Sequence, residues 1–142
     1  MSKRQVIEPP CRLLIVEDDW LISTMIQDQL TELNLEIAGV AANVPDALHL
    51  IETVEIDAAL VDMKLHEQFA GDVADTLKAH DIPFLFVTGY PTAPHPRYGG
   101  VPILLKPFDI AELKTAVEAV LPPKCLPGAP TVCATSTQPP SR

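Results

Sequence analysis

The sequence predicts an α/β domain built around a doubly wound parallel sheet. From residue 11 to residue 121, short apolar runs alternate with segments whose apolar residues recur at helical spacing. The runs are mainly apolar and do not alternate with polar residues, which is typical of strands that helices cover on both faces. Helices that connect successive strands imply right-handed crossovers, and therefore strands that run parallel to one another.

Five segments are expected to form the strands of this sheet. Each is a short, mainly apolar run, and the fourth has Pro83 at its entry, where a missing N–H costs least. The expected strands are residues 12–16, 36–42, 56–61, 84–87 and 101–105.

The first two helices are indicated by their caps and by an apolar stripe. Asp18 or Asp19 can cap a helix over residues 20–33, in which the apolar residues lie on one face. Asn43 caps the second helix, which tolerates Pro45 in its first turn.

The later helices follow the same logic. Residues 64–71 are expected to form a loop, and a helix is expected over residues 72–80. Asp109 caps the last helix, where Glu112 completes an approximate capping box.

One connection lacks the pattern of a helix. Between the fourth and fifth strands lie five residues that disfavour helix formation, namely Pro91, Pro94, Pro96, Gly99 and Gly100. The fourth helix is therefore predicted to be short, distorted or replaced by a mobile loop. Residues 1–10 are expected to be a lead-in, residues 11–121 the folded domain, and residues 122–142 a disordered tail rich in proline.

The composition limits the expected partners and location. The 142 residues carry a net charge of -9, so neither nucleic acid nor an anionic membrane surface is expected to attract the chain. No apolar run has the length of a membrane span, and the first ten residues do not resemble a signal-peptide core. We therefore expect a cytoplasmic protein that binds neither nucleic acid nor membrane.

The three cysteines do not indicate a disulfide framework or a metal site. Their number is odd, and two of them lie in the expected tail. We expect Cys125 and Cys133 to be free thiols, and Cys11 to pack beside the first strand.

Polar residues that suit phosphoryl chemistry follow four of the expected strands. The residues after the first, third, fourth and fifth strands are Glu17 with Asp18, Asp62, Thr88 and Lys106. Parallel strands bring these groups to the same edge of the sheet, where open α/β sheets bind their ligands. Carboxylates provide oxygen ligands for a hard divalent cation, and a hydroxyl and an ammonium group can contact a phosphoryl group that an aspartate accepts.

Each of these residues alone has an ordinary structural explanation. The acidic run after the first strand can simply cap a helix, and Asp62 can cap a loop. Thr88 can bond to the backbone of a turn, and Lys106 can be a solvated surface lysine. Their occurrence together, in this order and at strand ends, favours a functional site.

At these residues the sequence resembles the receiver domain of bacterial two-component response regulators, over about residues 11 to 121. The resemblance implies a (βα)₅ flavodoxin-like fold with sheet order 2-1-3-4-5, Mg²⁺ as cofactor and Asp62 as the phosphoacceptor. It makes Asp18 a direct Mg²⁺ ligand beside Asp62. It also implies a ligand role for the backbone carbonyl of Lys64 and, through water, for Glu17.

The same resemblance assigns the groups that contact the phosphoryl group. Thr88 is the switch hydroxyl, and Lys106 is the phosphate-binding lysine. The Lys106–Pro107 peptide bond is implied to be cis, an isomer that X–Pro bonds adopt at little cost.

Two features depart from the usual receiver pattern. Ile103 stands where the switch aromatic usually lies, and Gly89-Tyr90 follows the switch hydroxyl. Both features resemble the single-domain FAT GUY subfamily, whose signature the residues at positions 86–90 match except for Val87, where that signature has alanine. We expect Tyr90 to take over the role of the switch aromatic.

These inferences predict a stand-alone response regulator that is not an enzyme. Asp62 is expected to accept a phosphoryl group from a histidine kinase or a phosphotransfer protein in a Mg²⁺-dependent step. Signalling is expected to proceed through binding of a protein partner, without a DNA-binding output domain. The subfamily resemblance points to kinases of the HWE/HisKA2 type and to stress signalling.

Several alternatives remain open. The chain can be a phosphate sink for a kinase or a phosphorylation-independent scaffold. An aspartate-nucleophile phosphatase is disfavoured, because enzymes resembling the haloacid dehalogenase family carry a second aspartate where this chain has Lys64. A nucleotide- or flavin-binding domain is disfavoured because the turn after the first strand is acidic and repels phosphate.

Overall fold

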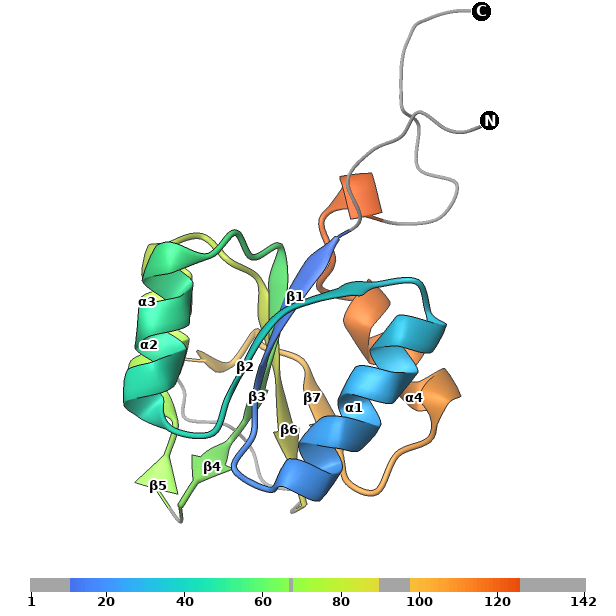
Figure 1. Cartoon of the computed structure of the whole chain (residues 1–142), viewed down its shortest axis with the longest axis horizontal. Helices are drawn as coiled ribbons and strands as arrows, with labels where there is room; N and C mark the ends of the chain where they lie inside the picture. The colour runs from blue at the N-terminus through green and yellow to red at the C-terminus, as the bar shows by residue number, and fades with distance from the viewer. Residues whose placement is uncertain (1–10, 67, 90–97, 126–142) are drawn as a thin grey trace, which may run out of the picture.

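The computed structural model describes residues 11–66, 68–89 and 98–125, which form a central parallel sheet between two layers of helices (Figure 1). The strands of this sheet are β1 (Arg12–Val16), β2 (Glu36–Ala41), β3 (Ala58–Asp62), β6 (Phe84–Thr88) and β7 (Ile103–Leu105). Their order is β2-β1-β3-β6-β7, and every neighbouring pair is parallel. Since β6 and β7 are the fourth and fifth strands of this sheet, the predicted order 2-1-3-4-5 and fold class are confirmed.

Four α-helices cover the sheet in the described part of the chain. They are α1 (Trp20–Glu32), α2 (Val44–Thr53), α3 (Gly71–Ala79) and α4 (Ile110–Glu118). Asp19 caps α1, Asn43 caps α2, and Asp109 forms a capping box with Glu112 at the start of α4, as predicted. None of these helices combines the length and the apolarity that crossing a membrane requires.

The core is divided into two layers by the sheet. Helices α1 and α4 cover one face, and α2 and α3 cover the other (Figure 1). Successive residues of a strand point to opposite faces, so Leu13 and Ile15 lie in the cluster beneath α1 and α4, whereas Leu14 and Val16 lie in the other cluster. Burial on both faces explains why the strands are apolar without alternation.

The segment after β3 differs from the predicted loop. It contains a short antiparallel pair, β4 (Lys64–Leu65) and β5 (Gln68–Phe69), at the end of the sheet opposite the start of β1 (Figure 1). The Ala70 N–H closes this hairpin by donating to the Met63 carbonyl oxygen, at 2.9 Å. Two-residue strands are too short to produce a periodic pattern, so the sequence alone could not indicate them.

The connection between β6 and β7 is described only in part. Residues 90–97, on which the prediction of a missing helix largely depends, lie outside the described residues. Tyr98 begins the described remainder, and its ring is buried against Phe69 and Phe86, at centroid distances of 5.6 and 5.8 Å. An expected loop segment thus contributes an aromatic side chain to the core.

The prediction that Cys125 is a free thiol is wrong. Cys125 ends a 3-10 helix, η2 (Pro123–Cys125), and forms a disulfide with Cys11, with a Cα–Cα distance of 5.7 Å. The chain returns after α4 to the place where β1 begins, a proximity that residues 114 positions apart do not reveal in the sequence. Cys11 is buried beside β1 as expected, and Cys133 lies outside the described residues.

Candidate functional site

Parallel pairing brings the polar ends of four strands to the carboxyl edge of the sheet. Val16 of β1 pairs with Val61 of β3. The next residues along the two strands, Glu17 and Asp62, therefore lie at the same level. Thr88 is the last residue of β6, and its partner in β7 directly precedes Lys106. The predicted convergence of these side chains at one edge therefore follows from the strand register.

Lys106 lies between two of the carboxylates. Its Nζ is 3.1 Å from Oε1 of Glu17 and 3.3 Å from Oδ2 of Asp62. The Lys106 N–H donates to the Thr88 carbonyl oxygen at 2.7 Å, which continues the β6–β7 pairing into the site. The Lys106 side chain is only 20% exposed, so this cation is held in place and is not a solvated surface lysine.

Burial shapes the ionisation of these groups. Glu17 is 2% exposed. Burial, followed by the proximity of Asp62, raises the pKa of Glu17 from 4.5 to about 8. Burial works to lower the pKa of Lys106, but the charges of Asp62 and Glu17 outweigh it and raise the pKa of this ammonium group. A positively charged lysine thus faces the Glu17 carboxyl group, whose ionisation burial disfavours.

The β4–β5 turn contributes a contact to the site that the sequence did not indicate. The His66 N–H donates to Oδ2 of Asp18 at 2.8 Å, and Nε2 of the ring lies 3.1 Å from the Ala42 carbonyl oxygen. His66 has a φ of 50°, a left-handed conformation that this turn requires. Burial acts to raise the pKa of Asp18, but the N–H of His66 contributes to lowering it below its ordinary value.

The pocket at this edge is rich in oxygen ligands. It has a volume of about 390 Å³. It is lined by Glu17, Asp18, Asp19, Ile22, Asp62, Lys64, Thr88, Gly89 and Lys106. Carboxylate oxygens of Glu17, Asp18 and Asp62 lie within 4.8 Å of one another. Because these like charges repel one another and hard divalent cations prefer oxygen ligands, the residues present fit a Mg²⁺-type cation.

The remaining predicted residues differ in how the structure places them. Lys64 is exposed, and its N–H donates to Oδ1 of Asp62 at 3.2 Å. Thr88 is buried and lines the pocket. The peptide bond before Pro107 is cis, the isomer that the resemblance implied. Tyr90 lies outside the described residues, so its assignment as switch aromatic stays a prediction.

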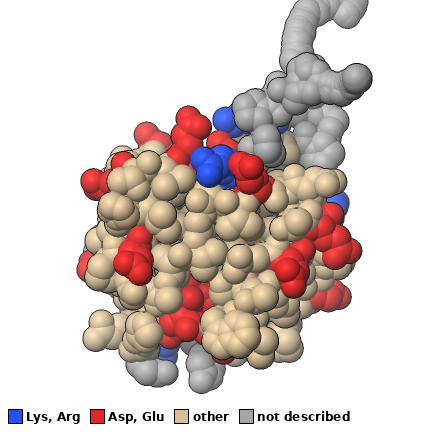
Figure 2. Space-filling view, viewed as in Figure 1, with Lys and Arg blue, Asp and Glu red and all other residues tan. Residues whose placement is uncertain are grey.

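The charged side chains visible on one face of the molecule are mainly acidic (Figure 2). Figure 2 shows Asp and Glu side chains spread over one face of the molecule, with few Lys or Arg side chains among them. The net charge of the chain is -9. This face therefore has no continuous basic surface of the kind that attracts a phosphate backbone.

Two curated relatives match over about three quarters of the chain. The transcriptional regulatory protein PdtaR of Mycobacterium tuberculosis is 30% identical over 114 residues, which are 77% of this chain and 56% of PdtaR. The phyllosphere-induced regulator PhyR of Methylorubrum extorquens is 27% identical over 118 residues, which are 77% of this chain and 43% of PhyR. The chain thus spans about half the length of the curated relatives that it matches.

Similar solved structures include one that this chain matches over nearly its whole length. The solution structure of SdrG from Sphingomonas melonis Fr1 has a TM-score of 0.71 at 36% identity, covering 80% of this chain and 98% of SdrG. The BeF3-activated conformation of SdrG from Pseudomonas melonis Fr1 has a TM-score of 0.67 at 37% identity, covering 76% of this chain and 93% of that one. Residues 13–118 match the profile of the response regulator receiver domain. By its fold, its strand-end residues and this match, the chain belongs to the response regulator receiver domain family.

Proposed function

We propose that the chain accepts a phosphoryl group on Asp62 and signals by presenting the modified carboxyl edge to a protein partner. The observation that carries this proposal is the position of the Lys106 ammonium group, 3.1 Å from Glu17 and 3.3 Å from Asp62. A fixed cation beside a strand-end carboxylate is suited to bind the phosphoryl group that this carboxylate accepts. Membership of the receiver family supports the same assignment.

The proposed transfer is a substitution at phosphorus. A carboxylate oxygen of Asp62 forms a bond to phosphorus, while the bond from phosphorus to the imidazole nitrogen of the donor's phosphohistidine breaks. Lys106 neutralises charge on the transferred group, and the Thr88 hydroxyl donates a hydrogen bond to one of its oxygens.

Mg²⁺ supplies the positive charge that allows two anionic reactants to approach each other. The residues proposed to hold it are Asp18, Asp62, the backbone carbonyl of Lys64 and, through water, Glu17. Asp18 is kept in place for this task by the His66 N–H, 2.8 Å from its Oδ2. A bound cation would favour the ionised form of Glu17, whose pKa is otherwise raised to about 8.

Exposed apolar residues beside the pocket support binding of a protein that carries the phosphohistidine. Trp20 and Leu21, in the first turn of α1, are 75% and 64% exposed, and they directly follow the acidic run that lines the pocket. Large exposed apolar side chains next to a reaction site are typical of a protein contact surface. We propose that the phosphotransfer region of a histidine kinase or phosphotransfer protein packs on them during transfer.

The added charge provides the signal in this proposal. Phosphorylation adds roughly two negative charges to a carboxyl edge that is already acidic. The switch groups would be Thr88 and, following the FAT GUY signature, Tyr90. Similarity to SdrG, which has been solved in a BeF3-activated conformation, supports a phosphorylation-dependent change of this kind.

The first test is intact mass spectrometry after incubation with acetyl phosphate. We expect a gain of one phosphoryl group that requires Mg²⁺ and is absent from Asp62→Asn. Asp28→Asn, which removes an exposed carboxylate from α1, is the matched control and should be phosphorylated like the unmodified protein.

The result also separates the alternatives. No gain in mass, from acetyl phosphate or from phosphorylated histidine kinases, would favour a scaffold that does not depend on phosphorylation. A phosphorylated form that decays faster than it binds any partner would indicate a phosphate sink instead of a signalling output.

A further inference from the structure

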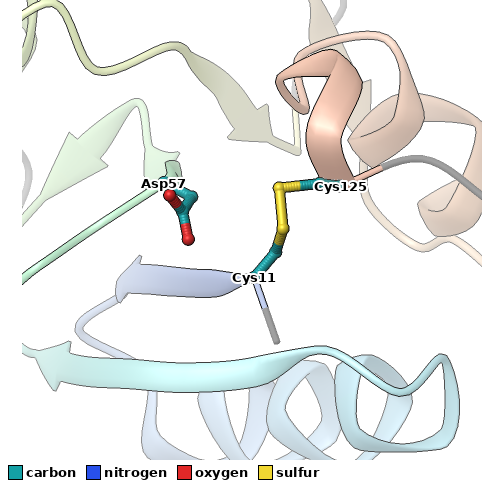
Figure 3. Close-up of side chains that lie close together, drawn as sticks. All are labelled: Cys11, Asp57 and Cys125. Atoms are coloured by element: carbon teal, nitrogen blue, oxygen red, sulfur yellow. A yellow bond between two sulfur atoms is a disulfide. The ribbon is translucent and has the colours of Figure 1, made fainter. Parts of the chain in front are cut away.

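We propose that Cys11 and Cys125 form a reversible thiol–disulfide switch, oxidised by peroxides or low-molecular-weight disulfides, at the edge of the sheet opposite Asp62. Cys11 precedes β1 and Cys125 ends η2, and their Cα atoms are 5.7 Å apart. This distance lies in the range that a disulfide spans without movement of the backbone. Figure 3 shows the sulfur–sulfur bond joining the two elements, with the Asp57 carboxylate beside it.

Asp57 contacts a sequence neighbour of each cysteine. Its Oδ2 accepts a hydrogen bond from the Arg12 N–H at 2.8 Å, and its Oδ1 lies 3.1 Å from Nζ of Lys124. Arg12 directly follows Cys11, and Lys124 directly precedes Cys125. These contacts do not involve sulfur, so they persist after reduction and keep the two thiols adjacent. Closure of the bond is then an intramolecular step, which is strongly favoured over reaction between two chains.

The two thiols differ in their access to solvent. Cys11 is buried, whereas Cys125 is partly exposed, so an oxidant reaches Cys125 first. The attacking species is the thiolate, which a neighbouring ammonium group stabilises. The charged group within 4.8 Å of both sulfur atoms is the Asp57 carboxylate, and its ion pair with Lys124, at 3.1 Å, offsets its negative charge.

The oxidation is balanced by the named oxidants. The Cys125 thiolate attacks one oxygen of hydrogen peroxide, the O–O bond breaks and hydroxide leaves, which gives a sulfenic acid. The Cys11 thiol then attacks the Cys125 sulfur, so that the S–S bond forms, the S–O bond breaks and water leaves with the thiol proton. Two thiols have lost two electrons and two protons, and the peroxide has become water. A low-molecular-weight disulfide gives the same product by two successive exchanges, and a dithiol reverses the reaction.

The oxidation state decides how the C-terminal end of the domain is held. In the disulfide form, η2 is covalently tied to the start of β1, which fixes the position of Cys125, the last described residue, relative to the sheet. In the reduced form, the ion pair to Lys124 holds this junction, and the Lys124 side chain is 64% exposed. Exposed ion pairs are weak, so reduction loosens the junction. Cys11, Asp57, Lys124 and Cys125 are not among the residues that line the pocket at the carboxyl edge.

The test uses the full chain with Cys133→Ser, so that two thiols remain. The protein is equilibrated in glutathione redox buffers or with hydrogen peroxide, treated with a thiol-alkylating reagent and weighed intact. We expect oxidation to remove two hydrogens and protect both cysteines from alkylation, and dithiothreitol to reverse the change. The oxidised form should unfold at a Tm on the order of 10 °C above the reduced form, with slower hydrogen exchange over residues 119–125.

Two control variants keep the result interpretable. Cys125→Ser, at the partly exposed position, should fold and should lose both the mass change and the Tm shift. Cys11→Ala should behave in the same way. Three outcomes would overturn the proposal: a bond that dithiothreitol cannot reduce in the folded protein, disulfide-linked dimers in place of the internal bond, or a reduced pair that takes up one Zn²⁺ with Asp57 and thereby resists oxidation.

Discussion

The two edges of the sheet hold their charged groups in opposite ways. At the carboxyl edge, three carboxylates lie within 4.8 Å of one another, and Lys106 contacts two of them. At the amino edge, where the strands begin, the Asp57 carboxylate contacts the Arg12 N–H and the Lys124 ammonium group, beside the disulfide that joins the two ends of the domain. A second carboxylate at this edge, that of Glu36, pairs with the Arg12 guanidinium. Negative charge is thus in excess at the first edge and compensated at the second.

This difference shows where the fold is stabilised and where it is not. Crowded carboxylates cost folding free energy, and such a cost is typical of sites that bind a ligand. A disulfide that closes a long loop reduces the entropy of the unfolded chain and contributes in the opposite direction. The disulfide at the amino edge therefore contributes stability that offsets this cost, and its two cysteines do not line the pocket.

The largest expected effect comes from opening the amino edge. The double substitution Cys11→Ala with Cys125→Ala should lower the free energy of unfolding by about 4 kcal/mol, because the chain regains the entropy of a loop of 114 residues. Urea denaturation of the oxidised protein and of this variant, both carrying Cys133→Ser, measures the difference. Acetyl phosphate should still modify Asp62 in the variant, and loss of this modification would show that the two edges are coupled.

Removing the cation from the carboxyl edge should have the next largest effect. Lys106→Met leaves Glu17 and Asp62 without their shared positive charge, so we expect a loss of about 2 kcal/mol in the free energy of unfolding at pH 8. Phosphorylation of Asp62 should also slow strongly.

Lys114→Met is the matched control for that prediction. It removes an exposed lysine paired with Glu118 one helical turn away, at 2.9 Å, and should cost less than about 0.5 kcal/mol. Equal losses of stability in the two variants would contradict the view that Lys106 balances buried negative charge.

The pH dependence of stability provides a third test of the carboxyl edge. The pKa of Glu17 is about 8 in the folded protein and 4.5 in its unperturbed state. Between these values the folded state binds more protons than the unfolded state, so stability without Mg²⁺ should fall as pH rises, by about 1 kcal/mol per pH unit. Urea titrations from pH 5 to pH 8.5 measure this slope.

Two changes should remove that slope. Glu17→Gln takes away the titrating group, and Mg²⁺ should flatten the slope by favouring the ionised carboxylate, so that it raises Tm more at pH 8 than at pH 6. Glu32→Gln, at an exposed position in α1, is the control and should leave the slope unchanged. A slope that persists in Glu17→Gln would assign the titration to another group.

The smallest expected effect is the loss of the charge contacts at the amino edge. Asp57→Asn removes the ion pair to Lys124 and weakens the acceptor for the Arg12 N–H, so it should cost about 1 kcal/mol in the oxidised protein. In the reduced protein it should also slow reoxidation. Glu36→Gln, which removes the ion pair of the Arg12 guanidinium, at 3.0 Å, serves as the control and should leave the reoxidation rate unchanged.

Local patterns in the sequence were sufficient for most of the carboxyl edge. An apolar run predicts a strand, a polar residue after it marks the strand's end, and parallel pairing then places Glu17, Asp62 and Lys106 together. The caps at Asp19, Asn43 and Asp109 are equally local, because each side chain bonds to the backbone within its own helix turn.

Contacts that depend on the tertiary structure could not be predicted in this way. The His66 N–H reaches Asp18 from a hairpin of two-residue strands, and Tyr98 enters the core from a segment whose composition indicates a loop. The bond between Cys11 and Cys125 forms because α4 carries the chain back to the start of β1. By itself the sequence determined the strands, most of the helices and the residues at the carboxyl edge, since these depend on neighbours along the chain. Only the tertiary structure decided the amino edge, because its partners meet through the path of the whole fold.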